Sequence, residues 1–291
     1  MFFGSIPALV TPFSDGRVAT DTLRQFVDWQ ISEGSNALVP CGTTGEVATL
    51  TADEHRHVIA TTVEAAQGRV PVIAGAGTYD TAASIERARA AADVGADAVL
   101  AVVPYYNKPS QAGLAAHFLA LADHSPLPIV LYNVPSRTVA DISVETLATI
   151  SRHPKIVAVK DATGNLGRVS AQRLACGDDF IQLSGNDDMA LGFNAMGGVG
   201  CISVSANVAP KLCSDFQKAT REARWDEALK LQDKLYPLHA ALFTDASPAP
   251  TKYALSRIRN DFPRELRLPL VEASDASKRA VDSALEHAGL I

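Results

Sequence analysis

The sequence lacks the features that would place this protein in a membrane, on nucleic acid or outside the cell. No stretch approaches the roughly 18 consecutive apolar residues of a membrane-spanning helix, and the segment AVLAVVPYY has only the length of a strand. The net charge of −6 comes with no basic stripe, so we expect no nucleic-acid partner. The N-terminal MFFGSIPALVTPF has no positively charged start and is interrupted by two prolines, unlike a signal peptide. We therefore expect a cytoplasmic protein with no membrane partner.

Cysteine and clustered histidine are also scarce. The sequence contains four cysteines, at positions 41, 176, 201 and 213. They show no C-x-x-C spacing, which favours reduced thiols over a disulfide framework or a metal site. His55 and His57 lie two positions apart in a predicted helix and therefore face different directions. We expect neither a metal ion nor any other cofactor.

One pattern recurs along the chain. The segments ISEGSNALVPCG, AAQGRVPVIAGAG and ADVGADAVLAVVP each contain the end of a predicted helix, a glycine and an apolar strand. Gly34, Gly68 and Gly95 stand where a helix C-terminus favours a left-handed residue. Thr51 with Glu54 three positions later is typical of a capping box at a helix start. The chain is therefore expected to alternate strands and helices.

The alternation predicts an α/β protein with eight parallel strands. The strands are expected to begin at residues 6, 36, 70, 97, 127, 155, 180 and 199. Eight such units in about 200 residues favour a closed (β/α)8 TIM barrel. The alternative, an open doubly wound sheet, is disfavoured because VTPFSDG after the first strand lacks a glycine-rich dinucleotide fingerprint. We expect the barrel to occupy residues 1–224 and a C-terminal helical extension to occupy residues 225–291.

The segment KIVAVKDATGN raises a question, because a run typical of a buried strand ends on a lysine. Side-chain alternation places Ile156, Ala158 and Lys160 on one face and directs Asp161 to the other. In a barrel, the carboxyl ends of the strands meet at one mouth, where the chemistry normally lies. The neighbouring strand brings Tyr132 to the same mouth. Desolvation disfavours an ammonium, so the sequence predicts a nucleophilic amine beside a phenol, as Schiff-base chemistry on a carbonyl requires.

Each of these features also has a structural explanation. Lys160 can extend to the barrel rim or pair with a carboxylate, and Tyr132 can be a core ring. CGTTGE can be an ordinary tight turn, and Arg137 in YNVPSRT can be a solvated surface residue. The convergence of several such groups on one mouth favours a catalytic site.

Five segments carry a resemblance to a known family: CGTTGE, YYNKPS, YNVPSRT, VKDATGN and HAGL, in this order and spacing. Together they resemble the dihydrodipicolinate synthase family of pyruvate-dependent lyases, from about Phe3 to the end of the chain. The resemblance implies a homotetramer that condenses pyruvate with L-aspartate-4-semialdehyde in the diaminopimelate route to lysine. It also implies that Lys160 forms the Schiff base and that Tyr132 transfers protons. Thr43 and Tyr106 would complete the proton relay, the tyrosine reaching into the site of a neighbouring subunit.

The resemblance also implies the residues that bind substrate. Thr44 and Gly185 match the positions that hold the carboxylate of pyruvate, and Ile202 matches a residue that lines the same pocket. Arg137 matches the arginine that receives the carboxylate of the semialdehyde. Members with strong feedback inhibition bind lysine through a serine, two histidines, an asparagine and a glutamate near the active-site tyrosines. At the matching positions this sequence keeps His55 and Tyr105 but has Val47, Ala52, Tyr79 and Ala83. We therefore expect weak or absent inhibition by lysine.

Two groups of alternatives remain open. N-acetylneuraminate lyase and 2-keto-3-deoxy sugar-acid aldolases would share Lys160 and Tyr132 but generally lack the arginine found here at position 137. Val139 and Ala140 stand where the family often has glycine, which puts the loop that carries Arg137 in question. A non-catalytic barrel that binds a keto acid would not need a reactive Lys160.

Overall fold

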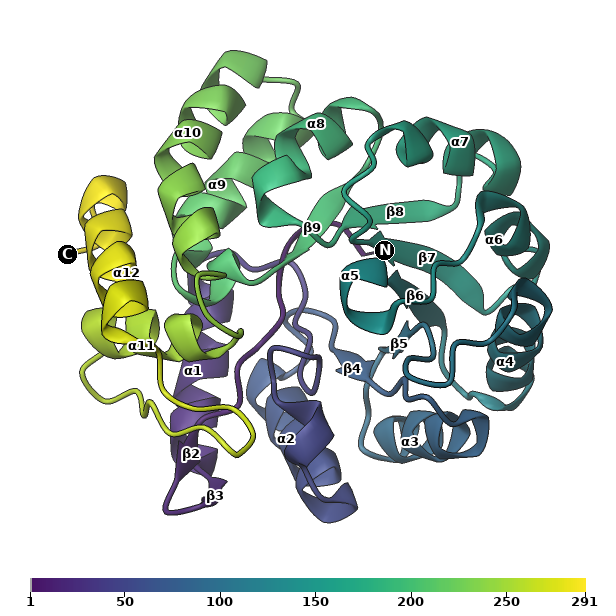
Figure 1. Ribbon diagram of the computed structural model, residues 1–291, viewed down its shortest axis with the longest axis horizontal. Helices are drawn as coiled ribbons and strands as arrows, with labels where there is room; N and C mark the ends of the chain where they lie inside the picture. Colours follow the sequence, from purple (N-terminus) through teal and green to yellow (C-terminus); the bar gives the residue numbers. More distant parts are fainter. Residues whose placement is uncertain (1) are drawn as a thin grey trace.

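A curled parallel sheet forms the centre of the computed structural model, which describes residues 2–291 (Figure 1). Within these residues, seven strands lie side by side in the order β1-β9-β8-β7-β6-β5-β4, and each pairs with its neighbours in parallel. The strands are β1 Gly4–Pro7, β4 Ile73–Gly75, β5 Ala98–Val102, β6 Ile129–Asn133, β7 Ile156–Asp161, β8 Ile181–Ser184 and β9 Gly200–Ser203. Apolar residues cover both faces of most strands, as expected where helices pack outside a parallel sheet.

The strand predicted from residue 36 closes the barrel without becoming a regular strand. Leu38 forms a parallel bridge to Val72, and Val39 forms one to Ala8. Pro40 then follows and has no N–H to continue the ladder. The predicted (β/α)8 barrel is therefore confirmed, with one of its eight strands reduced to single bridges.

Helices surround the sheet (Figure 1). They are α1 Thr20–Ser32, α2 Ala52–Ala66, α3 Thr81–Asp93, α4 Gln111–His124, α5 Pro135–Thr138, α6 Val144–Ile150, α7 Gly167–Cys176, α8 Ala190–Ala195 and α9 Pro210–Arg221. Short 3-10 helices lie at η1 Val47–Thr49, η2 Asp187–Met189 and η3 Ser205–Asn207. Thr51 and Glu54 form the predicted capping box of α2. None of the helices in the described part of the chain is long and apolar enough to cross a bilayer.

Two details of the strand predictions are wrong. The segment IPALVTPF, predicted from residue 6 as one strand, is a strand only as far as Pro7, and its Phe13 belongs to a small antiparallel hairpin, β2 Phe13–Ser14 with β3 Arg17–Val18. In β7, the register with β6 shifts between Ile129 and Val130, so that Ile156 packs in the outer core and Val157 against the inner one. A β-bulge of this kind reverses the alternation on one side of it only. Beyond the bulge, the predicted faces hold.

The core consists of two layers, and the inner one leads to the site. The outer layer fills the space between strands and helices. The inner layer fills the barrel with residues such as Ile6, Leu100, Val130, Ala158 and Leu183. Lys160 follows Ala158 on the same face, at the carboxyl end of the strand.

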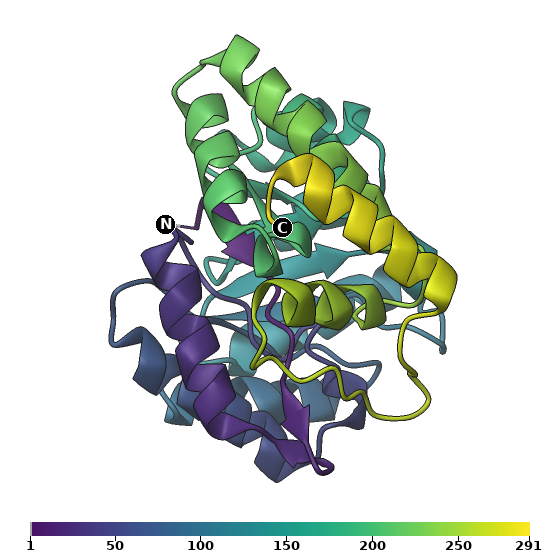
Figure 2. The same cartoon turned by 90° about the vertical axis from the view of Figure 1, so that its left-hand side faces the viewer.

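The C-terminal helices pack against the barrel, as Figure 2 shows. They are α10 Trp225–Ala241, α11 Ala249–Ile258 and α12 Asp275–Ala288. α10 contacts α9 and η2, and α12 contacts α10 and α11. Leu238 and Leu285 of these helices belong to the same buried cluster as Phe26 of α1, so barrel and extension share one hydrophobic core.

Candidate active site

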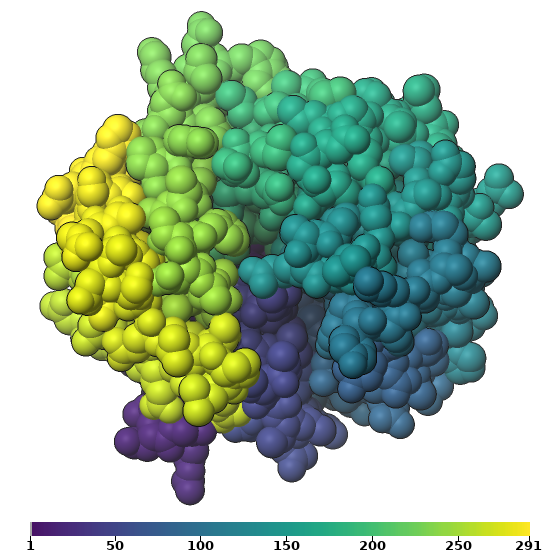
Figure 3. All heavy atoms as spheres, in the orientation of Figure 1, coloured from purple at the N-terminus to yellow at the C-terminus, as the bar shows by residue number. Residues whose placement is uncertain are grey.

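A cavity of about 310 Å³ opens at the carboxyl ends of the strands. The space-filling view shows the molecule hollowed between the C-terminal extension and the barrel loops (Figure 3). Its lining includes most of the residues that the sequence singled out, namely Thr43, Thr44, Tyr132, Arg137, Lys160 and Gly185.

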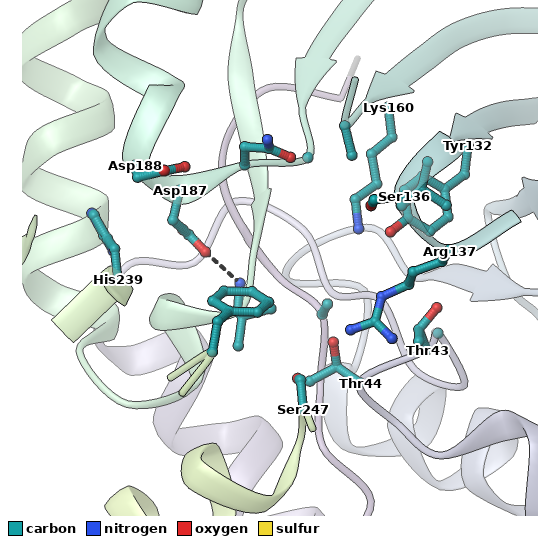
Figure 4. Close-up of a pocket in the computed structure, with 18 of the residues that line it drawn as sticks. Thr43, Thr44, Tyr132, Ser136, Arg137, Lys160, Asp187, Asp188, His239 and Ser247 are labelled. Carbon is teal, nitrogen blue, oxygen red and sulfur yellow. Dashed lines mark hydrogen bonds between the residues drawn. The ribbon is translucent and has the colours of Figure 1, made fainter. Parts of the chain in front are cut away.

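Lys160 supplies a buried amine. Its side chain is 6% exposed, and Figure 4 shows it directed from the strand end into the cavity. Tyr132 is its neighbour on β6 in the strand register, and Nζ lies 4.1 Å from the centroid of that ring. The ion pairs within residues 2–291 leave Lys160 without a carboxylate partner. An amine held in this way is available to attack a substrate carbonyl.

Asp161 faces away from Lys160, as the alternation predicts. Its carboxylate accepts hydrogen bonds from Thr163 N at 2.8 Å and from Gln172 Nε2 at 2.7 Å, and it lies 3.3 Å from Arg168 Nε. These contacts satisfy the carboxylate of Asp161 on the outer side of the sheet. The acid next in sequence therefore does not neutralise the amine.

The CGTTGE turn places two threonines differently. Thr44 is buried in the cavity wall, whereas Thr43 is exposed. Gly45 N donates to Gly42 O at 3.0 Å and Glu46 N donates to Thr43 O at 3.1 Å, which makes the turn compact. Within the described residues, no hydrogen bond joins the hydroxyls of Thr43 and Tyr132, which share the cavity wall with Lys160.

Arg137 lines the cavity from α5, a single turn that begins with a proline. It is exposed and, among residues 2–291, makes no salt bridge, so its guanidinium is available to an anionic ligand. Val139, which follows this turn, has a φ of 62° and is 66% exposed. The left-handed region disfavours a β-branched residue, which explains why glycine would suit this position. The valine is accommodated here, and the loop still brings Arg137 to the cavity.

Gly185 lies directly against the lysine. A Cβ at this position would stand 2.7 Å from Ala162 Cβ and 3.1 Å from Lys160 Cε. Its N–H already donates to Asp161 O at 2.7 Å. Its position in the cavity wall therefore depends on its lack of a side chain.

Two predicted site residues do not lie in the cavity. Ile202 is fully buried in the inner core beneath the cavity, and Val204, two positions later, lines the wall in its place. Ile202 thus lies outside the cavity lining of this structure, and its role in the pocket stays a prediction. Tyr106 is 91% exposed with a φ of 70°, and it is outside the set of residues that line the cavity of this single chain.

The sequence did not predict the opposite wall of the cavity. Figure 4 shows Asp187, Asp188 and His239 across the cavity from Arg137. Asp187 accepts hydrogen bonds from Val204 N at 2.9 Å and Ser205 N at 3.2 Å, so its carboxylate is fully engaged in holding the end of β9. The extension contributes Tyr236, His239, Ala240, Phe243 and Ser247.

His239 is a buried member of this wall. Its Nδ1 lies 2.7 Å from Ser205 Oγ. Burial lowers the pKa of His239, although the charges of Asp187 and Asp188 oppose this effect. Nothing in the segment PLHAALF marked the histidine as a cavity residue.

The arrangement determines the class of chemistry. An amine without a counter-ion adds to a carbonyl carbon, neighbouring hydroxyls move protons, and a free guanidinium receives a carboxylate. Among residues 2–291, no group of three or more His, Cys, Asp and Glu side chains has a metal-binding arrangement. The fold and the cavity together define a lysine-dependent lyase or aldolase built on a (β/α)8 barrel.

Comparisons with known proteins identify the family. Residues 1–288 match the model of the dihydrodipicolinate synthetase family. The chain is 65% identical over 291 residues to the 4-hydroxy-tetrahydrodipicolinate synthase of Zymomonas mobilis, covering 100% of both chains. It is 63% identical over 290 residues to that of Rhizorhabdus wittichii, again covering 100% of both. A solved dihydrodipicolinate synthase from Aquifex aeolicus superposes with a TM-score of 0.97 at 39% identity, with 99% of each chain covered. The chain belongs to the dihydrodipicolinate synthetase family.

Proposed function

We propose that the chain has 4-hydroxy-tetrahydrodipicolinate synthase activity, a lyase reaction that condenses pyruvate with L-aspartate-4-semialdehyde in the diaminopimelate route to lysine. The observation that carries this proposal is the buried Lys160 amine, which has no counter-ion and lies beside Tyr132 in a cavity of about 310 Å³. The relatives named for this activity, at 54–65% identity over nearly their whole length, support it.

The proposed reaction begins at Lys160. Its amine adds to the carbonyl carbon of pyruvate, and loss of water from the carbinolamine leaves an imine. Loss of a proton from the methyl carbon gives an enamine, whose carbon attacks the aldehyde carbon of the second substrate and forms the new C–C bond. The amine of that substrate then attacks the imine carbon, which closes the ring and releases Lys160. Each step moves protons, and we assign this transfer to Tyr132, Thr43 and Tyr106.

The remaining cavity residues are assigned to binding. We propose that Thr44 holds the carboxylate of pyruvate from the buried side of the turn. Gly185 provides the space that the Lys160 side chain and the bound pyruvate occupy. Arg137 receives the carboxylate of the semialdehyde, because a guanidinium binds a carboxylate through two parallel hydrogen bonds.

We propose that the active form is a homotetramer in the cytoplasm. The support is Tyr106, since a tyrosine that is 91% exposed in a left-handed conformation has few contacts in its own chain to stabilise it. A second copy that covers this loop would supply contacts and bring the hydroxyl to a site. We retain the division into a barrel of residues 1–224 and an extension of residues 225–291 as part of this proposal.

Trapping with borohydride tests the proposal directly. Pyruvate plus borohydride should inactivate the enzyme and leave a reduced three-carbon adduct on Lys160. Lys155 is the internal control, because its ammonium is hydrogen-bonded to Ser125 O. An adduct on Lys155 or Lys108, or none at all, would exclude the Schiff-base assignment. A coupled assay with the semialdehyde, run beside N-acetylneuraminate and keto-deoxy acids, then separates this activity from those of sister lyases.

A further inference from the structure

The turn that carries the two cavity threonines ends on a strained residue. Glu46 has a φ of 56°, in the left-handed region that side chains other than glycine rarely adopt. It is the N-cap of η1, and its N–H donates to Thr43 O at 3.1 Å. The conformation of Glu46 therefore sets where Thr43 and Thr44 stand.

The C-terminal extension holds the Glu46 side chain. Lys252 Nζ, from α11, lies 2.6 Å from Glu46 Oε1, and the two side chains are 0% and 1% exposed. The two groups form a buried ion pair. The other oxygen, Oε2, accepts a hydrogen bond from Arg267 N at 3.1 Å. The side chain of Lys252 and the backbone N–H of Arg267, both from the extension, thus hold one carboxylate behind the turn.

Lys252 is itself held in place. Its ammonium donates to Glu265 O at 2.7 Å and lies 4.4 Å from the centroid of the Phe13 ring. Burial lowers the pKa of Lys252, and the charge of Glu46 opposes this effect. A buried ammonium requires a fixed counter-charge, so the position of each partner depends on the other.

We propose that Glu46 and Lys252 are positioning residues of the active site, and that their buried ion pair lets the C-terminal extension fix the catalytic threonine turn. Neither residue lines the cavity. The pair acts through the backbone of the turn, so its loss should slow the proton transfers that need Thr43 and change little the binding of the semialdehyde, which is assigned to Arg137. The inference rests on the proposed function, because the rate it concerns is that of the synthase reaction.

The test separates stability from rate. Lys252→Met leaves a buried carboxylate alone and is expected to lower the melting temperature, whereas Glu46→Gln/Lys252→Met leaves no unpaired charge and should recover most of that loss. If the pair positions the turn, the double variant keeps kcat lowered by about 10- to 100-fold, the effect expected when a catalytic group moves by about 1 Å. Its KM for the semialdehyde should stay within about twofold of wild type. The rate of pyruvate adduct trapping should fall with kcat.

Two control variants exclude a general effect of damage to the extension. Leu255→Ala empties a fully buried site on the same helix without touching the turn, and it should lower stability but not kcat. Arg257→Met/Asp282→Asn removes an exposed ion pair, 2.8 Å long, between α11 and α12, and it should change neither.

Three results would overturn the inference: a folded double variant with wild-type kcat, a loss of kcat in Leu255→Ala equal to that of the double variant, or a KM that rises as much as kcat falls. If the double variant does not fold, Thr11→Val tests the premise that the position of the turn sets kcat, because Thr11 Oγ1 donates to Gly45 O at 2.7 Å. Unchanged kcat in that variant also overturns the inference. A wild-type enzyme inert toward the semialdehyde would instead refute the proposed function, and pyruvate trapping would still test the turn.

Discussion

Gly185→Ala is a small change that would displace Lys160, the proposed Schiff-base lysine. The added methyl group would stand 2.7 Å from Ala162 Cβ and 3.1 Å from Lys160 Cε, both closer than ordinary van der Waals contact. The backbone of Gly185 does not have a positive φ, so alanine meets no conformational penalty there. Any effect therefore comes from the collision with its two neighbours.

The size of the effect follows from these distances. Overpacking by one methyl group costs about 1–3 kcal/mol in stability. The more restricted unfolded chain returns about 0.4–1 kcal/mol, so we expect a net loss of roughly 0–2.5 kcal/mol. Ala162 Cβ is fixed to a strand end, whereas the Lys160 side chain can rotate, so the lysine is the partner that moves. A displacement of about 1 Å at the reacting group corresponds to roughly 100-fold in rate.

Two properties are measured for each variant: the rate at which borohydride traps the pyruvate adduct, and the free energy of unfolding in urea. Gly192→Ala is the matched control, since its Cβ would stand 2.8 Å from Leu166 Cδ1 and would not touch Lys160. We expect a slow adduct only in Gly185→Ala, whereas Gly192→Ala should cost little stability, because the contacted Leu166 methyl group ends a flexible side chain and alanine favours the helix. A wild-type adduct rate in Gly185→Ala, or an equal decrease in Gly192→Ala, would refute the steric explanation.

Four further outcomes are expected. Arg137→Ala should lower kcat/KM for the semialdehyde by an amount that corresponds to about 2–4 kcal/mol of lost transition-state stabilisation, while pyruvate adduct formation persists. An equal loss of adduct formation and of semialdehyde use would make the arginine structural. Tyr106→Phe should lower kcat roughly 100-fold with the fold intact, and dissociation of the oligomer should have a like effect; a fully active, well-folded monomer contradicts this. Val139→Gly should raise the free energy of unfolding by about 0.5–1 kcal/mol, because it relieves a left-handed valine, and a decrease in urea stability would count against strain there. L-lysine should not reach half-inhibition below about 1 mM in an initial-rate titration. Ala83 has no carboxylate that could pair with the ammonium of a bound lysine. The positive charge of Arg87, which acts to lower the pKa of both His55 and Tyr105, would also repel that ammonium.

Sequence periodicity predicted the barrel because each unit has its own local signals. The capping box at Thr51 marks the start of a helix, and the left-handed glycine at position 95 marks the end of one. Each signal lies within a few residues of the helix end that it marks. The face of Lys160 was also predictable, since alternation holds over the last residues of β7. Alternation failed at Ile156 because the bulge there depends on the pairing with β6, which leaves no trace in the residue types.

The groups that the sequence did not reveal have partners far away along the chain. His239 is held by Ser205, 34 positions away, and Arg267 donates to Glu46 across 221 positions. Taken alone, Lys252 in PAPTKYALSRI is typical of a solvated helix face, and Glu46 is typical of an ordinary turn. In the structure, the buried ammonium of Lys252 is tolerable only because Glu46 stands beside it. The left-handed backbone of Glu46 is in turn held because its carboxylate is fixed from behind. Each residue therefore explains the other, and the turn between Gly42 and Glu46 is in contact with a part of the chain that the barrel pattern does not require.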